Sequence, residues 1–287
     1  MMRTQSVKNL FGILLGVLLL FAGFSTQVMA VGNLMVTPTR VVFEKSTRTA
    51  QVTLINQDSQ TSNFRISFIR QNMTEDGEFI AAGESEAGLY SDPMIRFSPR
   101  QVSLPPGQSQ VIRLLLRKPG DLPDGEYRSH MLFQSLPPAS SSSVENVASD
   151  ESEGIKIELI PIVGVSIPVI VRHGKLSSRV VLTDAGIIPE SESGGGPKIS
   201  VDIGREGDAS AYGDFRATFT PSGGQPVIVA QANNVAVYSN LDMRRFSMPL
   251  SLPSGINLLK GKLDVYFIES GTDIESGTLA QTSLVLN

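Results

Sequence analysis

Short runs in which apolar and polar residues alternate make up most of the chain, and Gly, Pro, Ser and Asn separate these runs. In residues 63–70, for example, Phe64, Ile66 and Phe68 occupy every second position. This period of two is typical of a strand that buries one face. No sustained period of 3.6 residues occurs after Gly32, so the pattern predicts an all-β protein.

The predicted strands fall into two sets that meet near His173 and Gly174. The first set comprises residues 40–44, 50–56, 63–70, 93–98, 110–118, 126–135 and 155–172. The second set comprises residues 176–182, 197–204, 215–220, 226–237, 246–252, 261–269 and 279–286. Because the rhythm of strands and turns restarts at this junction, we expect two β-sandwich domains, residues 31–173 and 174–287.

Residues 155–172 (IKIELIPIVGVSIPVIVR) form the longest predicted strand. Every odd position in this segment is apolar, so one face of the strand presents a continuous apolar row. A typical strand has about five or six residues, so part of this row lacks a partner inside its own sandwich. Pro161 and Pro168 lack the backbone donor that a central strand needs, and they predict an edge strand.

Two explanations of this apolar row are open at this point. Exposed apolar edges promote aggregation and are normally avoided, so the row suits a strand that pairs with another polypeptide. Alternatively, a bulge at Gly164 turns the strand from one sheet to the other, and the row is covered internally. The Ser-rich, acidic residues 137–154 precede the strand, have little to bury and predict a mobile loop.

The first 30 residues have a different pattern. Arg3 and Lys8 precede the apolar run of residues 10–24, and small residues follow up to Ala30. This order predicts a secretory signal peptide, residues 1–30, cleaved after Ala30, and therefore an exported, soluble mature protein. The alternative, an uncleaved membrane anchor, requires an apolar run of about 20 residues.

Composition narrows the function further. The net charge of the 287 residues is −4, and residues 31–287 carry 22 bases against 28 acids, or −6. This mild acidity gives no electrostatic footprint for nucleic acid. The absence of Cys excludes disulfides, thiolate metal sites and cysteine nucleophiles.

Residues suited to catalysis are scarce. The two histidines, His130 and His173, stand in no metal-ligand spacing, and no nucleophile or metalloprotease motif occurs. We therefore expect a protein that is not an enzyme and that uses no cofactor and no metal.

Several blocks of the first domain follow one another in a characteristic order. They are residues 37–43 (TPTRVVF), 52–56 (VTLIN), 97–113 (FSPRQVSLPPGQSQVIR), 127–133 (YRSHMLF), 137–138 (PP) and 166–172 (SIPVIVR). In this order they resemble the periplasmic pilus chaperones of the chaperone–usher family. The resemblance covers residues 34–173, whereas the second domain is similar only in size and strand content.

The resemblance implies two immunoglobulin-like β-sandwich domains set at an angle, with a cleft between them. It implies a periplasmic chaperone that works without ATP and caps pilus or fimbrial subunits by β-strand donation. It also implies delivery of these subunits to an outer-membrane usher. An exposed edge strand would in addition allow the free protein to self-associate.

The same resemblance implies which residues bind the subunit. Arg40 occupies the position of the cleft arginine, whose bidentate fork grips the subunit's terminal carboxylate. Residues of the long strand complete the site: Leu159, Pro161 and Val163 at the family's insertion positions, Ile157 and Val165 flanking them, and Ile167 and Arg172.

The chain departs from the family pattern at two points. Pro168 stands where family members usually carry a lysine in the cleft, so carboxylate anchoring rests on Arg40 alone or recruits Arg172 or another base. The strand that carries Arg128 lacks the family's usual glutamate at that point, so the resemblance supplies no interdomain ion pair.

A second function class competes with the chaperone. An exported immunoglobulin-like protein can itself be a structural or adhesive component of a surface fibre or envelope complex. Such a subunit should lack a strand or carry a free N-terminal donor extension. Here only residues 31–36 precede the block 37–43 that contains the start of the first predicted strand, which favours the chaperone.

Overall fold

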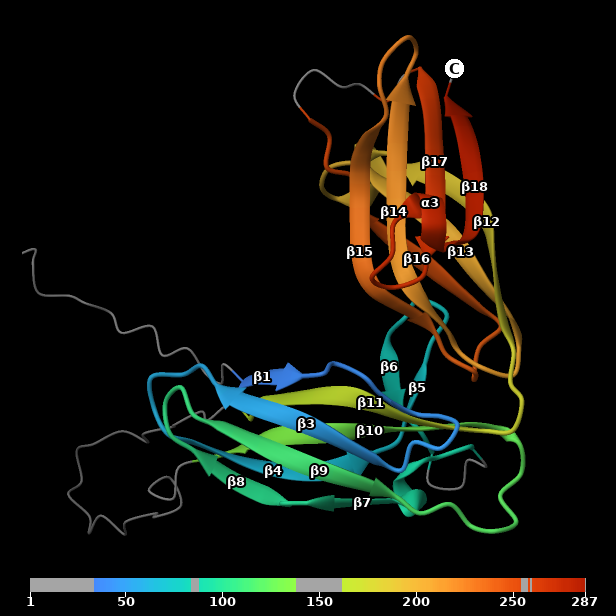
Figure 1. Ribbon diagram of the computed structural model, residues 1–287. Helices are drawn as coiled ribbons and strands as arrows, with labels where there is room; N and C mark the ends of the chain where they lie inside the picture. The colour runs from blue at the N-terminus through green and yellow to red at the C-terminus, as the bar shows by residue number, and fades with distance from the viewer. Residues whose placement is uncertain (1–33, 84–87, 138–161, 254–257, 259, 287) are drawn as a thin grey trace, which may run out of the picture.

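The computed structural model describes residues 34–83, 88–137, 162–253, 258 and 260–286, and these residues form an all-β protein of two immunoglobulin-like domains. The domains meet at an angle, with the second standing on one end of the first (Figure 1). The predicted signal peptide, nearly all of the predicted loop 137–154 and residues 155–161 of the long strand lie outside the described residues. Within the described part of the chain, no helix is long and apolar enough to span a membrane.

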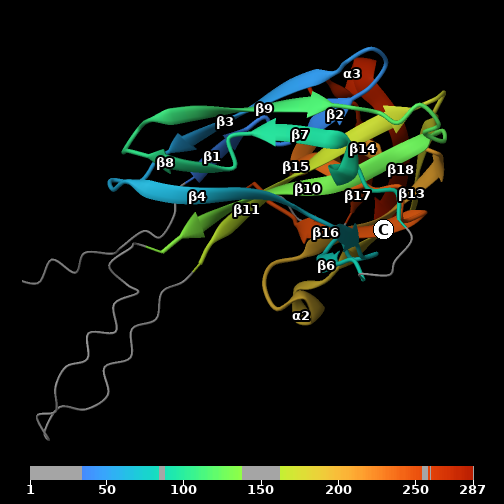
Figure 2. The same ribbon diagram turned by 90° about the horizontal axis from the view of Figure 1, so that it is seen from below.

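The first domain is a sandwich of two sheets. Sheet A contains β1 (Leu34–Thr37), β3 (Thr49–Asn56), β9 (Ser109–Leu116) and β7 (Ile95–Ser98), in that order. Sheet B contains β2 (Val41–Phe43), β11 (Gly164–His173), β10 (Gly125–Leu136), β4 (Ser62–Ile69) and β8 (Gln101–Leu104), in that order. Figure 2 shows sheet A as a layer beside β4, β10 and β11.

Strand β9 illustrates how the sequence makes this sandwich. Ile112, Leu114 and Leu116 are buried, whereas Arg113 and Leu115 between them are exposed, as the period of two predicts. The strand follows a turn that ends at Gly107, whose φ of +67° favours glycine. Side chains from both sheets then fill one core, which includes Phe43, Val52, Leu54, Ile112, Met131 and Phe133.

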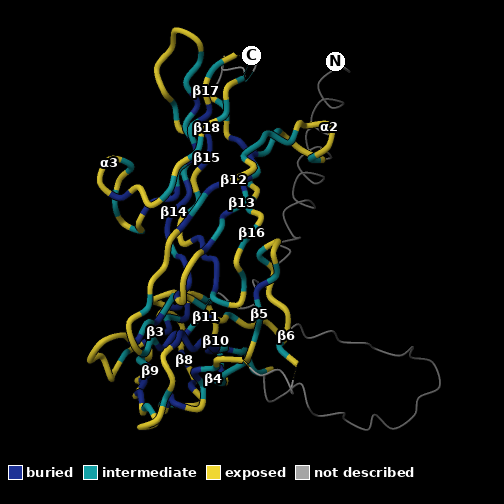
Figure 3. Tube along the Cα trace, turned by 90° about the vertical axis from the view of Figure 1, so that its right-hand side faces the viewer, coloured by how far each residue is buried: buried dark blue, intermediate teal, exposed yellow. Residues whose placement is uncertain are grey.

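The second domain is also a sandwich. One sheet contains β12 (Ser178–Ile188), β13 (Lys198–Gly207) and β16 (Met243–Pro249). The other contains β15 (Val227–Val237), β14 (Ala211–Pro221), β17 (Gly261–Ile268) and β18 (Thr278–Leu286). Buried residues gather between the sheets of each domain (Figure 3). Short helical turns, η1 (Asp92–Met94), α2 (Glu190–Ser193) and α3 (Ile274–Gly277), connect some strands.

A hairpin of the first domain reaches the second. Strands β5 (Gln71–Met73) and β6 (Phe79–Ala81) rise between the domains (Figure 1). The backbone N–H of Arg245 donates to the Glu75 carbonyl at 2.7 Å, and Asn240 Nδ2 donates to the Met73 carbonyl at 2.9 Å. An apolar cluster completes the junction: Met73, Ile170, Ala236 and Tyr238.

Strand β11 is shorter than the strand predicted from Ile155, because it begins at Gly164. Its ten residues pair with β10 from Gly164↔Gln134 to His173↔Gly125 without a register shift. The structure therefore shows no bulge at Gly164. On its other side, β11 pairs with β2 only from Val169 to Val171.

Candidate functional site

A cleft of about 690 Å³ lies where the two domains meet. Arg40, Glu44 and Arg172 line it from the first domain, and Ser210, Tyr212 and Leu279 line it from the second. The cleft thus brings together residues up to 241 positions apart, from Pro38 to Leu279. Three arginines, Arg40, Arg172 and Arg179, line the cleft against two glutamates, Glu44 and Glu269, so it is suited to an anion.

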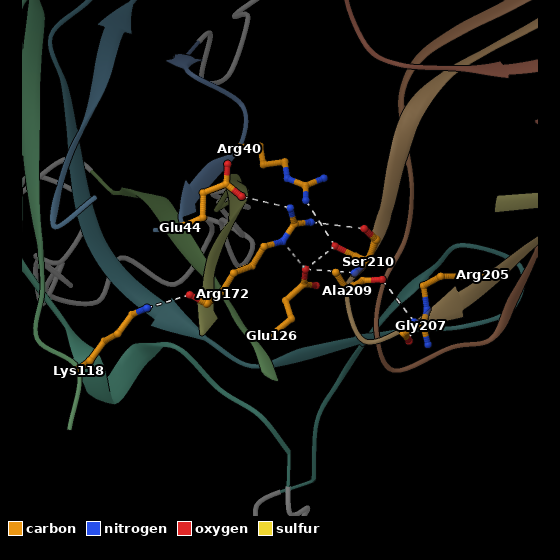
Figure 4. A network of polar contacts seen from close by, with 9 residues as sticks. All are labelled: Arg40, Glu44, Lys118, Glu126, Arg172, Arg205, Gly207, Ala209 and Ser210. Atoms are coloured by element: carbon orange, nitrogen blue, oxygen red, sulfur yellow. Dashed lines mark hydrogen bonds and ion pairs between the residues drawn. The ribbon is translucent and has the colours of Figure 1, made fainter. Parts of the chain in front are cut away.

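Arg40 lies just before β2 and projects toward the second domain (Figure 4). Its guanidinium carbon lies 4.0 Å from the centre of the Tyr212 ring, and its Nη2 donates to Ser210 Oγ at 3.4 Å. Its Nε and Nη1 are buried and have no hydrogen-bond partner among the described residues. Burial lowers the pKa of Arg40 from its ordinary value, but an arginine in a protein keeps its charge. Arg40 is therefore a cation fixed in position, and two of its donors have no hydrogen-bond partner among the described residues.

Arg172, at the end of β11, has a different environment (Figure 4). Its Nε lies 3.0 Å from Glu126 Oε2 and its Nη1 lies 3.5 Å from Glu44 Oε2. Its Nη2 donates to the Ser210 carbonyl at 3.4 Å. Every nitrogen of this guanidinium has a partner, so Arg172 is fully engaged in contacts within the protein.

Glu126 connects the two domains. Its Oε2 accepts hydrogen bonds from the backbone N–H of Ser210 at 3.1 Å and from Ser210 Oγ at 3.0 Å. The same oxygen receives the Arg172 bond, and the Glu126 side chain is fully buried. Sequence reasoning missed this residue, since it looked for a glutamate beside Arg128 and not two positions earlier.

The loop that carries Ser210 is held in place from within the second domain. Arg205, a buried residue of β13, donates from Nε to the Leu241 carbonyl at 2.8 Å. Its Nη1 donates to the carbonyls of Gly207 and Ala209. These bonds fix the loop just before Ser210, so that the hydroxyl and the N–H of Ser210 both face Glu126 (Figure 4).

A second polar contact between the domains lies beside the first. The guanidinium carbon of Arg128 lies 3.9 Å from the centre of the Tyr238 ring, and its Nη2 donates to Asn240 Oδ1 at 3.0 Å. His130 packs edge-on against Phe79 and Tyr238. Burial, and then the charge of Arg128, lowers the pKa of His130 to about 4. The imidazole is therefore neutral at physiological pH.

The predicted residues of the long strand fall into three groups. Ile157, Leu159 and Pro161 lie outside the described residues. Val163 is 39% exposed, and its neighbour Ile162 is 57% exposed. By contrast, Val165 is half-buried against the core of the first domain, and the side chain of Ile167 is only 3% exposed.

The expectation that Ile167 offers its side chain to a subunit is therefore wrong. Ile167, Val169 and Val171 belong to the core of their own sandwich, because strand alternation turns odd positions of β11 inward. The apolar row leaves this core only on moving back along the chain through Val165 to Val163.

Beside this row, the backbone of β11 has an open edge. Among the described residues, Gly164–Pro168 pair with β10 on one side only. The N–H of Ser135 donates to the Val163 carbonyl at 2.9 Å, so odd-numbered backbone groups face β10 and even-numbered groups face outward. Pro168, which has no N–H, falls on the outward side.

The structure therefore has two immunoglobulin-like domains with a cleft between them. Residues 33–172 match the family model described as "Pili and flagellar-assembly chaperone, PapD N-terminal domain". The first domain therefore matches this family, as a divergent relative. The family is one of chaperones rather than enzymes, its members are periplasmic, and the match favours a chaperone over a structural component of a fibre.

Several solved chaperone structures are similar to this chain at low sequence identity. The YadV chaperone is 12% identical with a TM-score of 0.43, over 88% of this chain and 99% of that one. The Escherichia coli chaperone DraB is 15% identical with a TM-score of 0.42, over 89% and 97%. The CsuC–CsuE pre-assembly complex of Acinetobacter baumannii is 12% identical with a TM-score of 0.40, over 75% and 90%. No curated protein sequence is significantly similar to this chain.

Proposed function

We propose that this protein is a periplasmic chaperone that works without ATP and holds an incomplete pilus subunit along β11 before an outer-membrane usher receives it. The observation that carries this proposal is the open edge of β11 beside an apolar row that leaves its own core at Val163. A subunit that lacks one strand offers the complement, an apolar groove bordered by unpaired backbone groups. β-strand addition satisfies both partners at once.

The energy for retention comes from side chains of the row that have no partner in the chaperone. Each fully buried Val, Leu or Ile contributes on the order of 1.5–3 kcal/mol before the costs of association. The predicted insertion residues Leu159, Pro161 and Val163, with Ile157 and Val165 beside them, would supply this burial. In this proposal, Ile167 keeps its side chain in the core of the first domain and contributes only as a backbone position of β11.

The cleft supplies the second contact. A subunit that pairs with β11 can place its terminal carboxylate against Arg40, whose Nε and Nη1 lack partners among the described residues. Arg172 instead holds Glu126, Glu44 and Ser210, so it positions the wall of the cleft. We therefore assign the carboxylate to Arg40 alone, with Tyr212 stacked behind its guanidinium.

The predicted signal peptide, residues 1–30, places this activity in the periplasm, where no ATP is available. The domains in this proposal are residues 31–173, which bind the subunit, and residues 174–287, which close the cleft. The same open edge would allow two copies of the free protein to pair.

Co-expression with the cognate subunit tests the proposal. Val163→Asp should abolish co-purification of the subunit, because the row would carry a charge into an apolar groove. Val285→Asp is the matched control, since Val285 is an exposed apolar strand residue of the second domain. Unfolding curves should show both variants folded. Undiminished co-purification with Val163→Asp would show that the row is not the binding element.

The carboxylate contact has its own test. Arg40→Ala should release the subunit, whereas Arg65→Ala, which removes an exposed strand arginine from the outer face of sheet B, should not. A subunit whose terminal carboxylate is amidated should bind wild-type protein as weakly as the natural subunit binds Arg40→Ala. Equal binding of the amidated and natural subunits would place the carboxylate elsewhere.

A further inference from the structure

Sheet A presents its outer face to solvent, on the layer opposite β11. The four strands of this sheet contain no Asp or Glu, although acids outnumber bases in the whole chain. Arg96 of β7 and Arg113 of β9 point outward from it, and both are exposed. The strands of sheet A therefore place cations and no acid on this outer face.

The strand register gathers these cations around one apolar residue. Leu115, which is 37% exposed, pairs with Arg96 on one side and with Thr49 on the other. Arg113 and Arg117 lie two residues before and two residues after Leu115, and both are exposed. Leu115 is thus surrounded by three guanidiniums on an exposed surface.

Two further cations lie at the end of sheet A but not on this outer face. Arg48 is exposed, and its carbonyl accepts from the backbone N–H of Leu116 at 2.8 Å, so it stands opposite a buried residue and not opposite Leu115. Lys118 Nζ donates to the Arg172 carbonyl of β11 at 2.8 Å, so it turns toward sheet B. Two neighbouring acids already pair with other arginines: Asp92 pairs with Arg70, and Glu44 pairs with Arg172.

No described ion pair neutralises Arg96, Arg113 or Arg117. Side by side on one face, like charges repel each other, and this cost is removed when carboxylates approach. The face is also hollowed between Gln51, Arg113 and Leu115. A hollow with an apolar centre and a charged rim has the anatomy of a protein interface.

We propose that this face, formed by Arg96, Arg113, Leu115 and Arg117, docks an acidic segment of a partner protein. The segment places one apolar side chain in the hollow beside Leu115, and its carboxylates pair with the surrounding guanidiniums. We name this surface the arginine face.

The composition of the arginine face favours a protein over an anionic membrane. Its three cations are all arginines, which protein interfaces select over lysine and which bind carboxylates bidentately. The single aromatic residue of sheet A, Phe97, packs against the core and is not available to insert into lipid.

The arginine face and the open edge of β11 belong to different sheets. A partner docked on sheet A therefore does not cover β11, and it can bind whether or not a subunit is held. This proposal goes beyond subunit binding and does not depend on it.

Fluorescence anisotropy with a labelled synthetic peptide tests the proposal, using a peptide in which glutamates flank a central leucine. Wild-type protein should bind it, and binding should weaken at least tenfold between 50 and 300 mM salt, as is typical of several ion pairs. Arg96→Glu combined with Arg113→Glu should weaken binding at least tenfold, and Leu115→Ala should weaken it severalfold without a change in charge. Arg65→Glu, on the outer face of sheet B, is the matched control and should change binding less than twofold.

Each contrary outcome is distinct. Equal weakening by Arg65→Glu would show unspecific charge attraction and overturn the proposal. Binding of wild-type protein to phosphatidylglycerol vesicles but not to the peptide would identify a membrane surface instead. A wild-type dimer in sedimentation that Arg96→Glu with Arg113→Glu dissolves would identify a second copy. Subunit co-purification with these variants, measured in parallel, should be unchanged, so failure here is separable from failure of subunit binding.

Discussion

Replacing Glu126 by Gln removes one charge from the contact between the domains without changing the size of the side chain. The Gln oxygen can still accept both bonds from Ser210, now as neutral hydrogen bonds. It can no longer face Arg172 as an anion, and this contact measures 3.0 Å in the wild type. The change therefore isolates the charge of one fully buried carboxylate.

The expected cost follows from burial. A hydrogen bond to a charged group contributes about 1.5–3 kcal/mol. Because the Arg172 side chain is 26% exposed, water can solvate its guanidinium in the variant. We therefore expect the free energy of unfolding to fall by about 1.5–2 kcal/mol, near the lower end of this range. Glu44→Gln is the matched control, since Glu44 faces the same arginine but is 49% exposed. Surface ion pairs of this kind contribute about 0–1 kcal/mol.

Urea unfolding measures the difference directly. The chain contains no Trp, so far-UV circular dichroism and tyrosine emission report the transition. Tyr212 and Tyr238, which lie at the domain junction, make the emission sensitive to it. The free energy of unfolding from linear extrapolation should fall for Glu126→Gln and stay nearly unchanged for Glu44→Gln. Equal effects of the two substitutions would refute the argument that burial makes the Glu126 charge important.

Two further predictions concern the same junction. Since burial lowers the pKa of His130 to about 4 from an ordinary value of 6.5, the unfolded state binds a proton first, and stability should fall as the pH drops from about 6.5 to about 4. His130→Phe should flatten this fall in unfolding titrations, and an unchanged pH profile would contradict it. Gly77 and Gly107 have φ of +83° and +67°, but only at Gly77 would an added Cβ meet Arg244, because open space surrounds Gly107. Gly107→Ala should cost about 1–2 kcal/mol for backbone strain alone, and Gly77→Ala should destabilise the protein more. Equal midpoints of the two variants in thermal unfolding would count against the contact between Gly77 and Arg244.

The period-two pattern was sufficient for most of the fold. Each of the seven runs predicted beyond Gly174 overlaps one of the strands β12–β18. The pattern missed β1, β5, β6 and β8, which have three or four residues each. Strands this short contain too few residues to display a period, even where two of them, β5 and β6, pair as a local hairpin.

The pattern also explains the error at Ile167. An apolar row on one strand face shows that the face is covered, but it does not show by which molecule. In the structure, the same row is internal at Ile167 and exposed at Val163. Only the length of sheet B, which depends on its other strands, determines where the row leaves the core.

The cleft could be predicted only in part. Arg40 was found through resemblance to a family. Glu126 and Ser210, 84 positions apart, meet because two domains dock. The alternation of Glu126, Arg128 and His130 on one face of β10 was a visible signal of a polar face. It could not reveal that a second domain covers that face, because strand periodicity carries no information about docking.

Amide hydrogen exchange along β11 tests the central claim most directly. The N–H groups of Gly164 and Ser166 face the open edge, whereas that of Val165 faces β10. Adding the pilus subunit should slow exchange at Gly164 and Ser166 by at least tenfold and leave Val165 nearly unchanged. If a bound subunit left exchange at Gly164 and Ser166 as fast as in the free protein, strand addition along β11 would be contradicted.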